Sequence, residues 1–190
     1  MTDLICGVDE AGRGPIAGPV TAASVILPPD FPENIFSDSK ACSPEKREEL
    51  LTIVLHEAVD YALGWSWPEE IDNLNIHNAT LLAMTRSLAG LTVPPERILV
   101  DGLYLPAWRV QSTAIVKGDS KIKEIMAASI LAKTARDRWM VRYSWLDHRY
   151  GFEQHKGYPT KLHRNLCRIY GLSPIHRRSF TIPSKPGKPS

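Results

Sequence analysis

The sequence predicts an α/β fold in which a mixed β-sheet is flanked by helices. Short apolar runs alternate with longer segments that carry an apolar stripe at helical spacing, which is typical of α/β proteins. The first two apolar runs are joined by a short glycine-rich turn, which is too short to contain a crossover helix. We therefore expect the early strands to pair antiparallel within the mixed sheet.

The individual elements follow from the same patterns. Apolar or alternating segments predict strands at residues 4–8, 20–27, 61–67, 97–102 and 113–119. A helix is expected from Ser43-Pro44, where Ser43 would cap the helix and Pro44 would take its first position. Two further helices are expected over residues 75–90 and 121–148. In the last of these, Ala127, Ala128 and Ser129 are small enough to let the helix approach the sheet closely.

Charge is distributed unevenly along the 190 residues, a length that allows one compact domain and a small appendage. The net charge is +2, yet residues 1–150 carry 15 Lys/Arg against 20 Asp/Glu, and residues 151–190 carry 8 against one. This asymmetry favours a polyanionic partner for the C-terminal segment, with a basic solvated tail as the equally weighted alternative.

The composition also indicates the cellular setting. No run approaches the roughly 18 apolar residues that a membrane helix needs, and the first residues lack the features of a secretory signal. The cysteines, Cys6, Cys42 and Cys167, are odd in number and widely spaced, so neither a disulfide framework nor a zinc knuckle is indicated. We expect a cytoplasmic protein that acts as a monomer.

Four acids stand at the ends of predicted strands, where folding does not require them. They are Asp9, Glu10, Asp101 and Asp119. Consecutive strand residues point to opposite faces, so Asp9 and Glu10 can share a site only if the strand breaks at Glu10. For Asp119, a helix-capping or turn-forming role and a catalytic role are equally weighted. Converging carboxylates without His or Cys would suit Mg²⁺ or Mn²⁺.

The turn that follows the first acids is the second chemical feature. Gly12-Arg13-Gly14 is not a phosphate-binding loop of the Gly-Lys-Ser/Thr type, and a plain tight turn is one interpretation. Its position beside the acids favours another, because backbone amides without side chains can approach a sugar-phosphate closely. Arg13 could add a phosphate contact.

Seven ordered blocks of sequence resemble the ribonuclease HII family, in its bacterial form. They cover nearly the whole chain and comprise Gly7-Val8-Asp9-Glu10-Ala11-Gly12-Arg13-Gly14-Pro15, Asp38-Ser39-Lys40, Ile98-Leu99-Val100-Asp101-Gly102, Lys117-Gly118-Asp119-Ser120, Ala127-Ala128-Ser129-Ile130-Leu131-Ala132-Lys133, Arg136-Asp137 and His155-Lys156-Gly157-Tyr158-Pro159-Thr160. One Gly-Arg-Gly turn alone would be weak, whereas the ordered set is specific, and all four acids match.

The resemblance implies a ribonuclease H-like fold with a small helical C-terminal extension. It implies hydrolysis of the RNA strand of RNA/DNA hybrids, and nicking of DNA on the 5′ side of embedded ribonucleotides, with 3′-hydroxyl and 5′-phosphate products. It also implies roles for individual residues. In the family, acids matching Asp9, Glu10, Asp101 and Asp119 hold the catalytic metal, Mg²⁺ or Mn²⁺, while residues matching Gly12, Arg13, Gly14, Lys40 and Tyr158 contact the substrate.

The resemblance also suggests how the chain divides. Residues 1–150 would form the catalytic domain, 151–182 a substrate-contacting extension, and 183–190 a disordered tail, without indicating a particular replication partner. Taken without the family, Tyr158 is a loop aromatic for which packing is the stronger interpretation. Asp137 lies beside Arg136 and Arg138, and an ion pair there is favoured over a role in the metal site.

Two functions from other classes compete with the ribonuclease. A non-catalytic binder of hybrids would use the basic C-terminal segment alone, but acids near phosphates would only weaken its binding. A different metal-dependent phosphodiesterase could share the fold, because fold alone does not decide the reaction. The Gly-Arg-Gly turn and Tyr158 argue against that second alternative.

Overall fold

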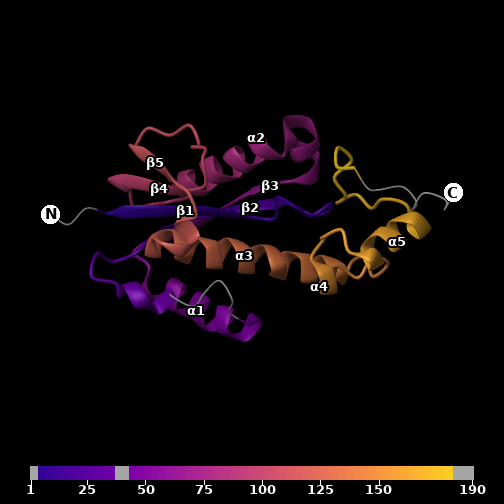
Figure 1. The fold of residues 1–190 in the computed structure, drawn as a ribbon, viewed down its shortest axis with the longest axis horizontal. Coiled ribbons are helices and arrows are strands. Elements are labelled where there is room, and N and C mark those ends of the chain that lie inside the picture. Colours follow the sequence, from indigo (N-terminus) through magenta and orange to yellow (C-terminus); the bar gives the residue numbers. More distant parts are fainter. Residues whose placement is uncertain (1–3, 37–42, 182–190) are drawn as a thin grey trace.

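The structure is a computed structural model that describes residues 4–36 and 43–181, and it contains a five-stranded mixed sheet. The strands are β1 (Ile5–Ala11), β2 (Val20–Ile26), β3 (Asp60–Ser66), β4 (Arg97–Asp101) and β5 (Ser112–Ile115). Their order in the sheet is β3-β2-β1-β4-β5 (Figure 1). β2 pairs antiparallel with β1 and with β3, whereas β1 with β4 and β4 with β5 are parallel. The predicted mixed sheet with antiparallel early strands is confirmed.

Helices cover both faces of this sheet. They are α1 (Pro44–Glu57), α2 (Pro68–Ala89), α3 (Lys123–Ser144), α4 (Phe152–His155) and α5 (Lys161–Tyr170), with 3-10 turns η1 (Glu33–Phe36) and η3 (Gly118–Ser120). Figure 1 shows α2 above the sheet, α3 below it, and α1 outside α3. One apolar core fills the space between β2, α3 and α1, and a second lies between the sheet and α2. None of the described helices is long and apolar enough to cross a membrane.

Close contact between β1 and α3 depends on small residues, as predicted. Ala127 and Ala128 of α3 are fully buried. A Cβ atom at Gly7 of β1 would lie 2.1 Å from the carbonyl carbon of Glu124, so no larger residue fits there without moving the helix. The close approach brings the middle of α3 to the strand that carries the first acids.

Several boundaries differ from the predictions. The strand expected over 113–119 ends at Ile115, because Lys117 adopts a left-handed conformation (φ 57°) and the chain turns into η3. The helical segment α2 begins earlier than expected, at Pro68, where the Glu70 carboxylate accepts the Trp67 amide at 2.9 Å. Within it the backbone of Asn75 is non-helical (φ 67°) and its side chain accepts the Asn78 amide at 3.1 Å, so a second helix does start at residue 75 as predicted. The helix expected over 121–148 covers 123–144. The predicted cap is confirmed, since the Ser43 hydroxyl accepts the Lys46 amide at 3.2 Å.

The C-terminal segment forms a small helical extension beyond the end of α3. In Figure 1, α4 and α5 lie at the end of the molecule away from the N-terminus. A third apolar cluster joins this extension to the body, and it comprises Ile16, Ala17, Met140, Tyr150, Phe152, Cys167 and Ile175. A β-bridge between Ala17 and His176 adds a backbone link. The extension is therefore anchored on the β1–β2 turn, next to the predicted substrate-contacting residues.

Candidate active site

Two of the predicted acids lie on neighbouring parallel strands. Val8 of β1 is aligned with Val100 of β4, so the next residues, Asp9 and Asp101, lie at the same level of the sheet. Burial raises the pKa of Asp9 well above its usual range, and the negative charges of Glu10 and Asp101 raise it further. These three acids therefore influence one another electrostatically, as convergence requires.

Asp9 is the most deeply placed of the acids, with 5% of its surface exposed. Its Oδ1 accepts the backbone amide of Glu10 at 2.7 Å, and a hydrogen bond with the Ser129 side chain partly offsets the rise in its pKa. Ser129 was expected only to let α3 approach the sheet. The structure adds a polar role for it, because α3 brings its side chain to the carboxylate of Asp9.

The expectation that the strand breaks at Glu10 is wrong. β1 continues to Ala11, and Glu10 is aligned with Ala22 of β2. Burial raises the pKa of Glu10, whereas a hydrogen bond from Arg13 Nη1 to its Oε1 at 3.1 Å lowers it. Asp101 adds a further rise to the pKa of Glu10, so the two acids interact although β1 remains regular.

Asp101 connects β4 to the turn that carries the fourth acid. Its Oδ1 accepts the backbone amide of Gly118 at 2.6 Å and that of Asp119 at 3.3 Å. A Cβ atom at Gly118 would lie 2.5 Å from Cδ1 of Ile125, so a side chain there would push the turn away from α3. The structure thereby places the backbone of Asp119 next to Asp101.

The charge balance of this cluster suits a divalent cation. Arg13 offsets the charge of Glu10, but the charged neighbours that act on Asp9 are both carboxylates. A buried carboxylate without a cationic partner is costly when ionised. The donor atoms of the four predicted acids are all oxygens, the ligands that Mg²⁺ and Mn²⁺ prefer. The residues therefore fit the predicted metal.

The Gly12–Gly14 turn lies directly beside Tyr158. Gly12 has a φ of 93°, and a Cβ atom there would lie 2.0 Å from Nε of Arg136. A Cβ atom at Gly14 would lie 3.7 Å from Cε1 of Tyr158, so the exposed side of the turn faces the aromatic ring. The sequence separates these residues by more than a hundred positions, and the fold brings them together.

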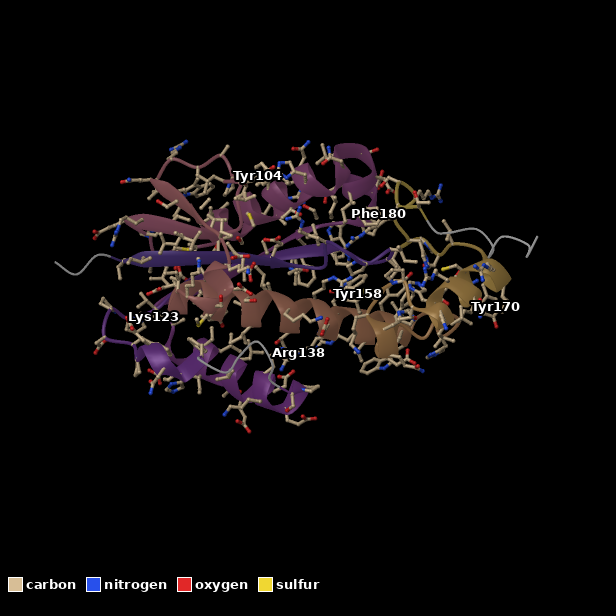
Figure 2. The ribbon with its side chains drawn as sticks, in the orientation of Figure 1. Tyr104, Lys123, Arg138, Tyr158, Tyr170 and Phe180 are labelled. Carbon is tan, nitrogen blue, oxygen red and sulfur yellow. The ribbon has the colours of Figure 1, made fainter. Side chains whose placement is uncertain are left out.

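Tyr158 is 41% exposed, in the region where the C-terminal segment meets α3 (Figure 2). The Nζ of Lys133 and the guanidinium of Arg136 lie 5.6 Å and 6.0 Å from the centre of its ring. An aromatic face left open beside cations suits contact with a sugar and its phosphates.

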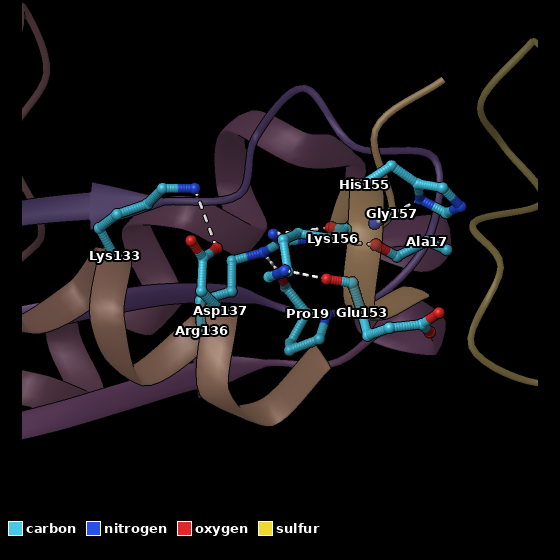
Figure 3. A network of polar contacts seen from close by, with 9 residues as sticks. All are labelled: Ala17, Pro19, Lys133, Arg136, Asp137, Glu153, His155, Lys156 and Gly157. Carbon is cyan, nitrogen blue, oxygen red and sulfur yellow. Dashed lines mark hydrogen bonds and ion pairs between the residues drawn. The ribbon is translucent and has the colours of Figure 1, made fainter. Parts of the chain in front are cut away.

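Arg136 is buried in this region, and the sequence assigns it no role beyond its place in a block that matches the family. Its guanidinium donates to the carbonyl oxygens of Ala17, Pro19 and Lys156 at 2.9–3.1 Å (Figure 3). It thereby joins α3 to the β1–β2 turn and to the loop before Tyr158. A helical arginine carries no sequence signal for carbonyl partners so distant along the chain.

The structure tests the prediction for Asp137 but not the one for Lys40. Asp137 makes an ion pair with Lys133 at 2.9 Å, one helical turn away, which confirms the ion-pair interpretation (Figure 3). Lys40 lies outside the described residues, as do Asp38, Ser39 and the tail 183–190.

Histidines of the extension form a hydrogen-bonded chain. Within residues 4–36 and 43–181, the one group of three metal-ligating side chains whose ligand atoms all lie within 4.8 Å is His163, Cys167 and His176. The Ser173 amide donates to Nδ1 of His176 at 2.9 Å, so the neutral ring carries its proton on Nε2. That Nε2 donates to Nε2 of His163 at 3.0 Å, and His163 donates from Nδ1 to the Tyr158 carbonyl at 2.9 Å.

Burial keeps these rings neutral, because it lowers the pKa of both His163 and His176 to about 4. Hydrogen bonds already use the nitrogens that would ligate a metal, so the cluster holds the Tyr158 loop in place instead. The four acids remain the predicted metal site.

A ribonuclease H-like mixed sheet, in which β1 and β4 carry interacting carboxylates and Asp9 is buried among carboxylate charges, is typical of a divalent-metal-dependent nuclease. The model of the family described as Ribonuclease HII matches residues 6–182. The chain belongs to the ribonuclease HII family. It is a hydrolase of the ribonuclease H class, which acts on RNA paired with DNA.

Individual relatives agree with this assignment. The chain is 49% identical to ribonuclease HII of Treponema denticola over 195 residues, which covers 94% of this chain and 98% of the relative. The crystal structure of ribonuclease H2 from Pyrococcus horikoshii OT3 superposes with a TM-score of 0.79 at 26% identity, covering 94% of each chain. Bst-RNase HIII, solved in complex with Mn²⁺, shares the fold at 17% identity, with a TM-score of 0.61 over 90% of this chain and 63% of that one.

Proposed function

We propose that the protein hydrolyses the RNA strand of RNA/DNA hybrids and nicks DNA on the 5′ side of embedded ribonucleotides. The products are a 3′-hydroxyl and a 5′-phosphate. Asp9, Glu10, Asp101 and Asp119 hold Mg²⁺ or Mn²⁺, and residues 151–182 complete the catalytic domain 1–150 by contributing a substrate contact.

One juxtaposition carries the proposal: the acidic end of β1 continues directly into a glycine turn that faces Tyr158. Divalent ions held by these acids would supply an activated water and would stabilise charge on the leaving oxygen. The chain's own residues select the bond. The 2′-hydroxyl distinguishes ribose from deoxyribose, and the Gly12–Gly14 backbone lies close enough to the acids to contact it. Tyr158 packs against the sugar of the adjacent deoxynucleotide, while Arg13 and Lys40 contact phosphates.

The direct test is cleavage of a labelled DNA duplex that contains one ribonucleotide. We expect a single nick 5′ of the ribonucleotide in Mg²⁺ or Mn²⁺, and no nick with a chelator, because the carboxylates cannot act without the ions. The nicked strand should serve as a primer for a DNA polymerase, which requires a 3′-hydroxyl. The all-DNA duplex of the same sequence is the control, and its cleavage at a similar rate would contradict recognition of ribose.

The contact made by Tyr158 can be tested separately. In the Tyr158→Ala variant we expect cleavage at the RNA-to-DNA junction to slow by about ten-fold or more, since stacking and packing of one aromatic ring contributes roughly 1–3 kcal/mol. Long uniform hybrids should lose less, because they offer alternative registers. Tyr170→Ala is the matched control, as Tyr170 is also half exposed but lies on α5. Equal junction rates for wild type and Tyr158→Ala would remove the assigned role.

A further inference from the structure

Arg177 is a buried cation whose side-chain hydrogen bonds converge on the β1–β2 turn. It lies in the chain after α5 and has no exposed surface. Its Nη2 donates to the Gly12 carbonyl at 2.6 Å, and its Nη1 donates to the carbonyls of Arg13 and Pro15 at 3.0 Å and 2.7 Å. Its Nε donates to the Gly18 carbonyl at 2.9 Å. One side chain thus binds four carbonyls of a single seven-residue turn.

Because it is buried, Arg177 does not contribute to the basic surface that the uneven charge distribution predicted for the C-terminal segment. Burial and the neighbouring charge of Arg136 lower the pKa of Arg177 to about 9, so it remains a cation at neutral pH. The ring of Phe180 covers the guanidinium at 5.1 Å. Carbonyl dipoles, which point their negative ends at the cation, take the place of a carboxylate partner.

Backbone contacts extend the same connection to the tyrosine loop. The Arg177 amide donates to the Ile16 carbonyl at 2.9 Å, and the Ile16 amide donates to the Gly157 carbonyl, also at 2.9 Å. Gly157 immediately precedes Tyr158. Arg177 is therefore connected to both parts of the proposed ribose-recognition surface, the Gly12–Gly14 turn and the loop that carries Tyr158.

We propose that Arg177 is a positioning residue, which holds the Gly12–Gly18 turn in the conformation that recognises ribose. The C-terminal extension then contributes to selectivity by fixing the conformation of the turn through Arg177, in addition to any contact that it makes with nucleic acid. When Arg177 binds a carbonyl of the turn, the direction of that carbonyl is fixed. Because the peptide unit is planar, the direction of the N–H group in the same peptide is then fixed as well. The inference rests on the proposed function, because it assigns that turn to ribose.

No other side chain can make the same set of contacts. A guanidinium carries five N–H groups in a rigid plane, of which four directions are used here, whereas lysine has three donors on one rotating ammonium. Arg177→Lys therefore keeps the charge and most of the volume but cannot hold four carbonyls. Arg178→Lys is a matched control, because it is the same exchange one residue away at an exposed position.

The first measurement is amide hydrogen exchange of the full-length protein. In Arg177→Lys we expect exchange to rise in residues 12–18 and 155–158 while β2 and β4 stay at wild-type rates. A merely destabilised protein would exchange faster throughout. Unchanged exchange in the turn would overturn the proposal. If Arg177→Lys does not fold, Phe180→Leu decides the matter, since it removes only the covering ring and should loosen the same segments to a smaller extent.

The second measurement compares affinity for two duplexes, one with a single ribonucleotide and one of DNA alone, in chelator so that neither is cut. In Arg177→Lys the preference for ribose should fall by about ten-fold, because lysine cannot hold all four carbonyls of the turn in place. Affinity for the all-DNA duplex should not change. An unaltered preference would overturn the proposal. If wild type shows no preference and makes no nick, the proposed function fails, and hydrogen exchange alone decides whether Arg177 positions the turn.

Discussion

Asp9→Asn should abolish metal-dependent cleavage while leaving the fold intact. The substitution keeps the size of the side chain and an oxygen that can accept the Glu10 amide, but it removes the charge that a divalent ion would neutralise. Loss of several kcal/mol of metal-based stabilisation corresponds to a decrease in rate of about 10³-fold or more. Initial rates on the single-ribonucleotide duplex, over a range of Mn²⁺ concentrations, measure the effect.

Without metal, we expect the opposite effect on stability: Asp9→Asn should be more stable than wild type at high pH. Burial raises the pKa of Asp9 in the folded state, so its contribution to stability is fully present below the unfolded value of about 3.8 and is lost as pH rises through the folded value. Asparagine cannot ionise. In chelator, the Tm of Asp9→Asn should therefore match wild type near pH 4 and exceed it at pH 8.

Added metal should reverse that order. Wild type gains stability because the ion binds the folded state, whereas Asp9→Asn gains little. Asp30→Asn removes the same charge at an exposed position and should behave as wild type in cleavage and in Tm. An Asp9→Asn variant that cuts at the wild-type rate, or whose Tm rises with Mn²⁺ as much as that of wild type, would exclude Asp9 from the metal site.

The sequence predicts those parts of the site that depend on residues close together along the chain. An acid that ends an apolar run, such as Asp101, and glycines that punctuate a turn are recognisable locally, and the order of strands follows from short connections. The break expected at Glu10 failed because the sequence cannot show that β1 stays paired with β2 up to Ala11. The strand expected over 113–119 ends early, at Ile115, because Lys117 is left-handed and the chain turns to where Asp101, from another strand, accepts the Gly118 amide.

The supporting residues could not be predicted for a related reason. Arg136 and Arg177 bind carbonyls, which every residue possesses, so their partners leave no mark on the sequence. Arg177 is more than 150 positions from the turn it holds, and its neighbour Arg178 has the same residue type but is exposed. Only the packing of the extension against Ile16 and Ala17 decides which arginine is buried.

Gly12→Ala should both destabilise the protein and slow its cleavage of the ribonucleotide duplex. The new methyl group would lie 2.0 Å from Nε and 2.4 Å from Cδ of Arg136, and the backbone is left-handed (φ 93°). Overpacking costs about 1–3 kcal/mol and left-handed backbone adds roughly 1–2 kcal/mol, so the free energy of unfolding should fall by about 2–5 kcal/mol. Denaturant unfolding without metal measures that change.

Gly171→Ala separates the two contributions, because Gly171 is also left-handed (φ 75°) but a Cβ atom there has no neighbour within 4 Å. The free energy of unfolding of Gly171→Ala should fall only by the roughly 1–2 kcal/mol that the left-handed backbone costs, and its rate of cleavage should remain close to that of wild type. In Gly12→Ala, Arg136 must move to admit the methyl group, and its bonds to Ala17 and Lys156 move with it. Cleavage of the ribonucleotide duplex should therefore fall even at temperatures where the variant is folded. A folded Gly12→Ala enzyme with wild-type rate would mean that the turn does not need this conformation to recognise ribose.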